Sequence, residues 1–480
     1  MKHHRLLLAF LLSTLGLGQP SFAAERRPNV LFIIVDDLTT TLSCYGDRDA
    51  RTPHMDALAA RGVRFERAYT QFALCNPSRA SFLTGCYPER TKVFNLEQNF
   101  RGALPDIVTM PQLFKNAGYA TGRVGKVFHV PDPKSQFDVV SASALAKDNA
   151  VLEEAKLARS RESAMSDPPI AKGKANRSYN QNYAASARPP QDFTDYDIAT
   201  RAIGALEAFR DQAFFLAVGF IRPHTPYVAP QSYFDLIDPR KIAMPPFYRA
   251  GGEDTALIPD AALRPNNNVF SFKAPDVPTA REARRAYLAS TAWVDSQVGR
   301  VLAKLKELRL DGNTIIVLTG DHGYHLGEHG LWAKQTLFEN GTRVPLMVVA
   351  PGVKPGVSAG LVEQVDIYPT LAELAGFEVP RHIQGVSLQP LLAAPRGQGK
   401  PAVFSTMVST HTRLTGHSIR TDRFRYIEWD DGRAGRQLYD YETDPDELRN
   451  LAADPRHADR AARLKEQLTA HLWAVAANGK

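Results

Sequence analysis

The sequence predicts an α/β fold in which a mostly parallel central sheet is flanked by helices, followed by a small C-terminal α+β subdomain. The first observation is a continuous apolar, β-rich run at residues 29–35, which is typical of a buried strand of a parallel sheet. The second is that similar runs recur at residues 213–220, 314–319 and 345–350. Helical patterns separate the runs, most clearly near residues 281–309, and this alternation indicates an α/β arrangement.

The first residues of the chain indicate its compartment. A basic start at residues 1–5 precedes an apolar run at residues 6–17, which is too short to span a bilayer comfortably. Residues 21–23 then offer small side chains at the positions that a signal peptidase reads. We therefore expect residues 1–23 to be a cleaved signal peptide, and the mature protein to be periplasmic or secreted with no membrane span.

The length of 480 residues indicates one large domain and one smaller one. We expect the large domain at residues 24–395, with a surface insertion at about 132–192 that is rich in Ser, Ala, Lys, Asn and Pro. A linker rich in Gly and Pro then leads into the smaller subdomain at residues 396–480. This subdomain contains a strand-like run at residues 418–429 and a terminal helix from about residue 456.

Charge and cysteine content narrow the class of protein. The 58 basic and 51 acidic residues give a formal net charge of +7, a mild excess that fits a solvated surface, and we expect no nucleic-acid partner. The three cysteines, Cys44, Cys75 and Cys86, exclude a disulfide-rich scaffold. Their odd number leaves at least one thiol unpaired, and Cys75 is the candidate for a special role.

Acidic residues follow two of the predicted buried strands. Asp36 and Asp37 come directly after the first strand, and Asp321 and His322 follow the strand at 314–319. In parallel sheets, ligands bind beyond the carboxyl ends of the strands. A single such pair is more typical of a helix cap or a solvated turn, but two pairs at strand ends favour a metal site. The mostly oxygen ligands suit a hard cation such as Ca²⁺ or Mg²⁺.

The segment around Cys75 has the features of an anion site. Pro77 predicts a helix that starts at or near Cys75, and a helix N-terminus binds anions through its free amide groups. Arg79 lies one helical turn further on and can point its guanidinium at the same place. The alternative is a buried structural cysteine, which is the commoner fate of this residue type.

Several motifs together resemble those of type I, formylglycine-dependent sulfatases. The segment Cys75–Arg79, followed by Leu-Thr-Gly at residues 83–85, resembles the signature of that family. Further similarity lies at residues 124–129, 321–323 and 332–334, and the resemblance covers nearly the whole mature chain. It implies an alkaline-phosphatase-like α/β core with a small C-terminal subdomain. It also implies that a formylglycine-generating enzyme oxidises the cysteine before the protein folds.

The resemblance implies a metal ion beside the modified cysteine. The ion would be Ca²⁺, with Mg²⁺ as the alternative. Its ligands would be Asp36, Asp37, Asp321 and His322, and the formylglycine formed from Cys75 would complete the shell.

The resemblance also implies catalytic roles around the hydrated aldehyde. Arg79 would hold the hydrate, and Lys126 and His129 would contact it. His129 would help to eliminate sulfate from the covalent intermediate. His224 and Lys334 would bind the sulfate oxygens, and one of them would assist departure of the alcohol. Taken singly, His129 and His224 are more typical of surface or interior positions without a catalytic role, but His224 follows the strand at residues 213–220, which favours a functional role. The assignment of Lys126 and Lys334 depends on the family pattern.

Within the family, the resemblance is strongest to the iduronate-2-sulfatases. It implies a sulfated uronate or a related sugar, in glycosaminoglycans or other sulfated polysaccharides, as the substrate. One alternative is a phosphomonoesterase or phosphonate hydrolase of the same superfamily, because phosphate and sulfate esters share shape and metal needs. The other is an exported glycan-binding protein without turnover. A binder has no need of Arg79, Lys126 and His129 around Cys75, which argues against this second alternative.

Overall fold

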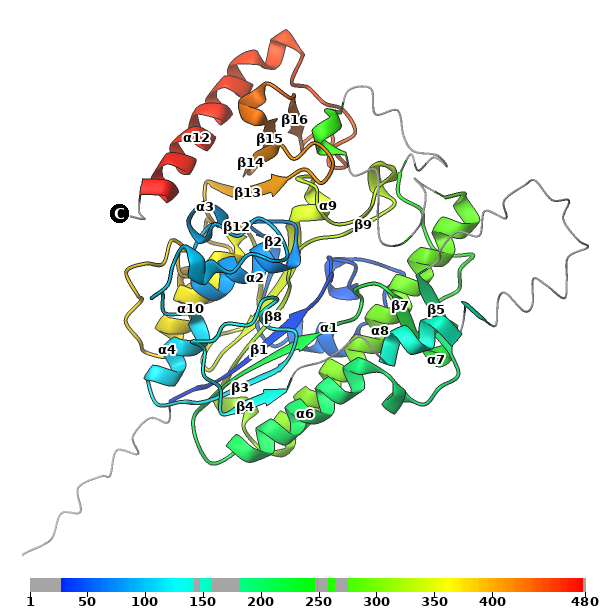
Figure 1. The fold of residues 1–480 in the computed structure, drawn as a ribbon, viewed down its shortest axis with the longest axis vertical. Helices are drawn as coiled ribbons and strands as arrows, with labels where there is room; N and C mark the ends of the chain where they lie inside the picture. The colour runs from blue at the N-terminus through cyan, green and yellow to red at the C-terminus, as the bar shows by residue number, and fades with distance from the viewer. Residues whose placement is uncertain are drawn as a thin grey trace, which may run out of the picture.

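A computed structural model gives the fold of the protein (Figure 1). It describes residues 27–141, 147–154, 156–157, 182–246, 248, 258–263, 269 and 275–477. The predicted signal peptide at residues 1–23 lies outside the described residues, and so does much of the predicted insertion, from residue 158 to residue 181.

The centre of the described fold is an eight-stranded sheet with the order β12-β2-β11-β8-β1-β6-β3-β4. β11 runs antiparallel to both of its neighbours, whereas the other neighbouring pairs are parallel, so the prediction of a mostly parallel sheet is confirmed. The four apolar runs found in the sequence form β1, β6, β8 and β11. The strands are β1 (Asn29–Val35), β2 (Val63–Tyr69), β3 (Ala120–Gly125), β4 (Val139–Ser141), β6 (Phe214–Phe220), β8 (Thr314–Gly320), β11 (Arg343–Val349) and β12 (Gly356–Glu363).

Helices cover both faces of this sheet (Figure 1). Alternate residues of β1 face two separate hydrophobic cores, one packed against α2, α4 and α10 and the other against α1, α6 and α8. Among the described residues, none of the helices combines the length and apolar character needed to cross a membrane. The helices are α1 (Pro53–Ala59), α2 (Cys75–Thr84), α3 (Pro88–Thr91), α4 (Met110–Asn116), α6 (Thr194–Phe209), α7 (Gln231–Asp235), α8 (Val277–Glu307), α9 (Glu339–Thr342), α10 (Ile367–Leu374), α11 (Gln389–Ala393) and α12 (Ala458–Ala477).

The C-terminal part of the chain forms a four-stranded antiparallel sheet against which α12 packs. The strand-like run predicted at residues 418–429 is two strands, because Asp422 and Arg423 form the turn between β14 and β15. α12 begins close to the predicted start of the terminal helix. The strands of this sheet are β13 (Ala402–Val408), β14 (Thr415–Thr421), β15 (Phe424–Trp429) and β16 (Arg436–Asp440).

The described parts of the predicted insertion at 132–192 are tied into the fold. β4 extends the central sheet by pairing with β3, and β5 (Tyr183–Ser186) pairs in parallel with β7 (Tyr227–Pro230). Asp148, which lies between β4 and β5 in the sequence, is buried. A further short hairpin, of β9 (His325–Leu326) and β10 (Trp332–Ala333), follows β8.

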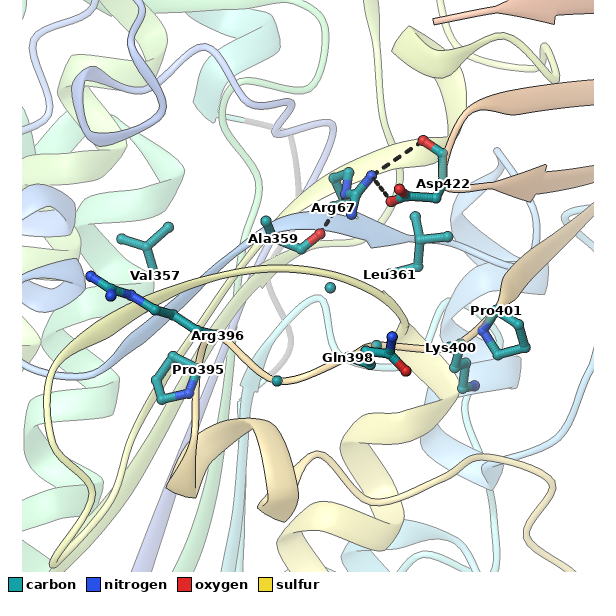
Figure 2. A pocket seen from close by; sticks show the side chains of 13 residues that line it. Arg67, Val357, Ala359, Leu361, Pro395, Arg396, Gln398, Lys400, Pro401 and Asp422 are labelled. Carbon is teal, nitrogen blue, oxygen red and sulfur yellow. Dashed lines mark hydrogen bonds and ion pairs between the residues drawn. The ribbon is translucent and has the colours of Figure 1, made fainter. Parts of the chain in front are cut away.

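A pocket of about 610 Å³ lies where β12, the linker after α11 and the β14–β15 turn meet (Figure 2). Arg67 of β2 lies at this junction. Its Nη1 is 2.6 Å from Asp422 Oδ1, and its Nε donates to the carbonyl oxygen of Ala359 at 2.5 Å. None of the candidate site residues lines this pocket.

Candidate active site

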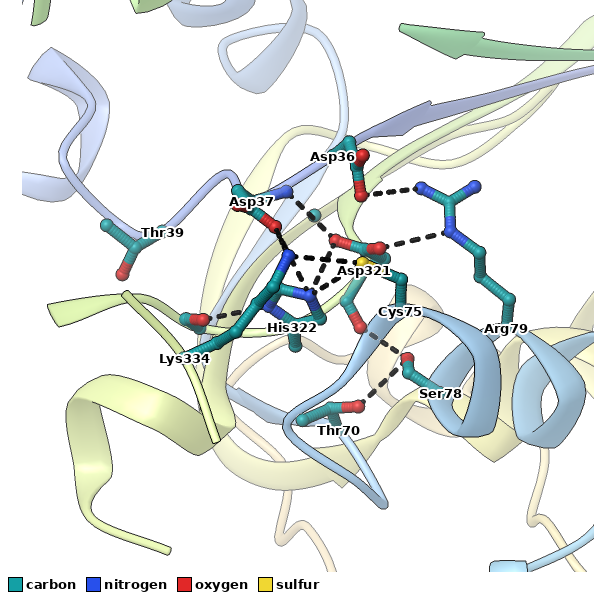
Figure 3. Close-up of polar contacts among 12 residues, drawn as sticks. Asp36, Asp37, Thr39, Thr70, Cys75, Ser78, Arg79, Asp321, His322 and Lys334 are labelled. Carbon is teal, nitrogen blue, oxygen red and sulfur yellow. Dashed lines mark hydrogen bonds and ion pairs between the residues drawn. The ribbon is translucent and has the colours of Figure 1, made fainter. Parts of the chain in front are cut away.

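The fold brings the two acidic pairs together at the carboxyl edge of the sheet. β1 and β8 are parallel neighbours in which Val35 pairs with Gly320, so the residues that follow them leave the sheet side by side. The backbone N–H of Asp37 donates to Asp321 Oδ1 at 3.0 Å. The two acidic pairs that the sequence places after these strands therefore lie close together (Figure 3).

α2 begins at Cys75, as the sequence predicts, and aims its N-terminus at the acidic pairs. The Cys75 Sγ lies 3.4 Å from His322 Nε2 and 3.2 Å from Lys334 Nζ. Burial, together with the nearby Asp36, raises the pKa of the Cys75 thiol to about 12. An unmodified cysteine here therefore stays protonated at neutral pH and is a poor nucleophile.

The donor groups of the cluster fit a hard divalent cation. Ligand atoms of Asp36, Cys75, Asp321 and His322 all lie within 4.8 Å of one another, and all four residues are buried. The His322 Nδ1 lies 2.9 Å from the carbonyl oxygen of Gly323. Donation of a proton by Nδ1 to that oxygen leaves a lone pair on Nε2, as a metal-binding histidine requires. The carboxylate oxygens suit Ca²⁺ or Mg²⁺ better than a soft metal.

A second arrangement of the same cluster includes Asp37. Ligand atoms of Asp36, Asp37, Cys75 and His224 also lie within 4.8 Å of one another. Together the two arrangements contain each of the predicted metal ligands, and they add His224, which the sequence places among the sulfate-binding residues. The structure thus brings the predicted ligand set together.

Arg79 contacts two of the carboxylates. Its Nε lies 3.0 Å from Asp321 Oδ2, and its Nη2 lies 3.2 Å from Asp36 Oδ1. Its Nη1 donates to the carbonyl oxygens of Lys126 and Val127. With cysteine at position 75, Arg79 therefore orients the acidic residues of the cluster.

Two lysines neutralise the remaining negative charge. Lys126 contacts Asp36, and Lys334 contacts Asp37. Burial raises the pKa of Asp36, but Lys126, His224 and Arg79 outweigh it and hold that pKa well below its usual value. Burial lowers the pKa of Lys334, but Asp37 and the other anionic groups raise it well above its usual value. Charged ammonium groups and ionised carboxylates therefore share a buried site.

His224 belongs to this cluster, and both candidate histidines, His224 and His129, are neutral at pH 7. Burial lowers the pKa of His224 to about 4, and its Nδ1 lies 2.6 Å from the Thr225 carbonyl oxygen. Burial, followed by the charge of Lys126, lowers the pKa of His129 to about 4. The His129 Nδ1 has no hydrogen-bond partner among the described residues. An anionic ester bound beside these rings raises the pKa of both, because an opposite charge favours the protonated form.

Further polar residues, absent from the sequence prediction, hold the site in place. Ser78 donates through its hydroxyl to the carbonyl oxygen of Asp321, and Thr70 donates to the Ser78 hydroxyl at 3.0 Å. Gln364 Nε2 donates to the carbonyl oxygen of Gly320 at 2.6 Å. Ser78 lies inside the cysteine motif, but Thr70 and Gln364 carry no local sequence signal, because only the fold brings them to the end of β8.

Fold and site together define a hydrolase with an alkaline-phosphatase-like core. Residues 28–377 match the sulfatase family, and residues 327–473 match the family of the C-terminal part of N-sulphoglucosamine sulphohydrolase. The chain belongs to the sulfatase family and is a hydrolase of sulfate esters.

Curated relatives and solved structures agree with this assignment. A sulfatase of Formosa agariphila is 32% identical over 94% of this chain and 89% of its own length. Iduronate 2-sulfatase of Mus musculus is 32% identical over 94% of this chain and 95% of its own length. Among solved structures, the phosphonate monoester hydrolase of Silicibacter pomeroyi is similar with a TM-score of 0.76 and 28% identity, covering 92% of this chain and 95% of the other.

Proposed function

We propose that this protein is an exported sulfatase that hydrolyses sulfate monoesters with a formylglycine at position 75 and a bound divalent cation. The observation that carries the proposal is the position of Cys75. Its Sγ lies at the N-terminus of α2, inside the cluster of buried carboxylates and basic side chains. Burial raises the pKa of a thiol in this position, and conversion of the thiol to an aldehyde would supply a reactive group there.

The candidate ligands support a cation between β1, β8 and α2. Asp36, Asp37, Asp321 and His322 would hold Ca²⁺, with Mg²⁺ as the alternative, next to residue 75. A cation held there would polarise the sulfate group, and the hydrated aldehyde at position 75 would supply the attacking hydroxyl.

The basic residues of this chain have separate tasks in the reaction. Arg79 keeps the carboxylates of Asp36 and Asp321 oriented, and Lys126 neutralises Asp36. Lys334, which stays protonated, lies against Asp37 and position 75 and therefore points a positive charge at the sulfate oxygens. The positive charges of these three side chains stabilise the negative charge that develops as the ester bond breaks.

The two histidines are placed to move protons. The Nδ1 of His224 lies 2.6 Å from the Thr225 carbonyl oxygen, which leaves Nε2 as the atom that would bind the sulfate or assist the leaving alcohol. His129 lies close enough to Lys126 and Arg79 for their charges to lower its pKa, and its Nδ1 is free of protein partners among the described residues. It therefore serves as the base that accepts a proton when sulfate is released.

We infer that the substrate is a sulfated uronate or a related sugar of a glycosaminoglycan or another sulfated polysaccharide. The similarity to iduronate 2-sulfatase supports this class. The basic start and short apolar run of residues 1–23 support export to the periplasm or medium, and the cysteine motif supports maturation by a formylglycine-generating enzyme.

The test is aldehyde trapping on protein produced together with a formylglycine-generating enzyme. A hydrazide is added, and the peptide that contains position 75 is examined by mass spectrometry; an adduct at that position is expected. Kinetics with 4-nitrophenyl sulfate follow, and the Cys75→Ala variant is expected to lose both adduct and turnover. A free thiol at position 75, despite competent maturation, contradicts the proposed mechanism.

Phosphonate or phosphate ester hydrolysis is the second candidate function. The similarity to the phosphonate monoester hydrolase of Silicibacter pomeroyi supports it, because that similarity covers 92% of this chain at 28% identity. The ratio of kcat/KM for 4-nitrophenyl sulfate to that for 4-nitrophenyl phenylphosphonate distinguishes the two. A ratio well below one on matured protein favours the second function.

A further inference from the structure

The turn that carries His224 is held from inside by Arg222. The Arg222 guanidinium donates through Nη1 to the carbonyl oxygens of both His224 and Pro226, so one side chain fixes both ends of the His224 turn. Arg222 is 1% exposed, so water does not compete for its two hydrogen bonds to the turn.

Asp148 holds Arg222 in this orientation. The Asp148 Oδ2 lies 2.8 Å from Arg222 Nη2, and both side chains are 1% exposed. The other carboxylate oxygen accepts a hydrogen bond from the N–H of Thr194, at the start of α6, at 3.0 Å. Asp148 thus ties Arg222 to a helix that packs on the central sheet.

Asp195 completes the support on the backbone side. Its carboxylate accepts hydrogen bonds from the N–H groups of Ile221 at 2.7 Å and Arg222 at 2.9 Å. Asp195 holds the chain before the His224 turn, whereas Arg222 holds the turn itself. Of the two acids, only Asp148 makes an ion pair with the guanidinium, so Asp148 is the group that sets the direction of that side chain.

We propose that Asp148 is a positioning residue of the active site, which acts through Arg222 to fix the turn that presents His224 to the Asp36–Asp37–Cys75 cluster. The inference rests on the proposed function for the role of His224. It gives the described part of the 132–192 segment a task in the reaction, although that segment contributes no ligand to the cluster. Breaking a buried ion pair on one side is costly, so loss of the Asp148 carboxylate is expected to disturb the Arg222 guanidinium.

The experiment is a double-mutant cycle on matured, cation-loaded protein with 4-nitrophenyl sulfate as the probe. Asp148→Asn keeps the size of the side chain and is expected to lower kcat/KM by about 10–100-fold, the range that misplacement of a catalytic group produces. Asp148→Asn combined with His224→Ala is expected to be no slower than His224→Ala alone, because the two changes remove one function. Asp148→Glu, which restores a carboxylate, is expected to recover part of the lost activity.

The matched control is Glu153→Gln, which removes a carboxylate of the same segment whose side chain is 69% exposed. It is expected to leave kcat/KM unchanged. Multiplicative losses in the double variant would overturn the proposal, since a general loss of stability acts independently of His224. If Asp148→Asn fails to fold, Arg222→Lys takes its place in the cycle. This change keeps the positive charge but removes the hydrogen bonds to the carbonyl oxygens of His224 and Pro226.

A crystal structure of Asp148→Asn separates this proposal from the proposed function. Displacement of the His224 ring from its position beside Asp37 supports the positioning role, even if the wild-type protein turns over no sulfate ester. An unmoved turn overturns the positioning role, even if the wild-type protein is an active sulfatase.

Discussion

The hydroxyl of Tyr287 donates a hydrogen bond to the carbonyl oxygen of Asp37 at 2.7 Å. The same hydroxyl accepts from the N–H of Thr39 at 3.0 Å, so one group bridges the two sides of the turn after β1. Asp37 has a φ of 60°, a left-handed conformation that costs a residue with a side chain about 1 kcal/mol. A tyrosine of α8 thus bridges the turn that carries a candidate metal ligand in this conformation.

Tyr287→Phe is therefore expected to weaken divalent cation binding by about tenfold, the worth of one buried hydrogen bond. The change keeps the aromatic packing against Tyr227 and Tyr324 and removes only the bridge. Calorimetric titration of chelator-treated protein with Ca²⁺ measures the effect. The control is Tyr233→Phe, whose hydroxyl donates to Ser296 at 2.9 Å away from the site. Equal affinities for Tyr287→Phe and wild type would rule out the bridging role.

Lys334→Met is expected to lower kcat/KM for 4-nitrophenyl sulfate by about 10²–10³-fold, the usual cost of losing one group that stabilises transition-state charge. Lys334 contacts both Asp37 and Cys75, and the anionic groups around it keep it charged despite burial. Methionine keeps the length of the chain and removes the charge. Lys306→Met, on the exposed side of α8, serves as the control for loss of one lysine. Unchanged kinetics in Lys334→Met would exclude the residue from sulfate binding.

The parts of the site that the sequence predicts are those with a local signal. Asp36 and Asp321 follow apolar runs long enough to identify as strands, and Pro77 marks the helix start at Cys75, so their meeting could be expected from general rules of parallel sheets. His224 follows the predicted strand at residues 213–220 and so has a weaker signal of the same kind, whereas the assignment of Lys334 depends on the family pattern.

The residues that support the site, such as Tyr287 and Asp148, could not be predicted from the sequence, because they come close to the site only when the chain folds. Tyr287 is separated from Asp37 by 250 positions, and its side chain reads as one more apolar residue of a long helix. Asp148 lies in a segment without periodicity, which the sequence describes as a surface insertion, yet it is 1% exposed and paired with Arg222. The apolar run at residues 345–350 predicts the strand β11 but not its antiparallel direction. The run resembles those of the parallel strands of the same sheet, so the sequence pattern does not distinguish the two directions.

Removal of divalent cations is expected to abolish turnover and to lower the thermal midpoint of unfolding. A cation that binds only the folded state stabilises it by about 2.7 kcal/mol at a hundred times its dissociation constant. Asp321→Asn is expected to lose this Ca²⁺-dependent gain, because Asp321 belongs to the ligand cluster. Thermal scans with Ca²⁺, with Mg²⁺ and with a chelator measure both effects. A midpoint that is the same in all three conditions would argue against a cation site.

Acid stability is expected to depend on Glu339, which joins the two parts of the chain. Glu339 of α9 lies 2.5 Å from Arg425 Nη2 of β15 and accepts a hydrogen bond from Tyr69 at 2.9 Å. Burial raises the pKa of Glu339, but Arg425 and two further arginines outweigh it and lower the pKa to about 2 from 4.5. The contribution of the carboxylate to folding, roughly 3 kcal/mol, is therefore complete above pH 4.5 and is lost as the pH falls towards 2.

Glu339→Gln is consequently expected to lower the thermal midpoint at pH 7, and the difference from wild type is expected to shrink as the pH falls from 5 to 3. Asp422→Asn is the matched control, because Asp422 also pairs with an arginine across the same junction, at 2.6 Å, but is 83% exposed (Figure 2). Solvent screens such a pair, so its removal should barely move the midpoint at any pH. A constant difference between Glu339→Gln and wild type across this range would mean that the carboxylate does not titrate with folding. The proposed pH-dependent contribution of the buried Glu339 charge would then be excluded.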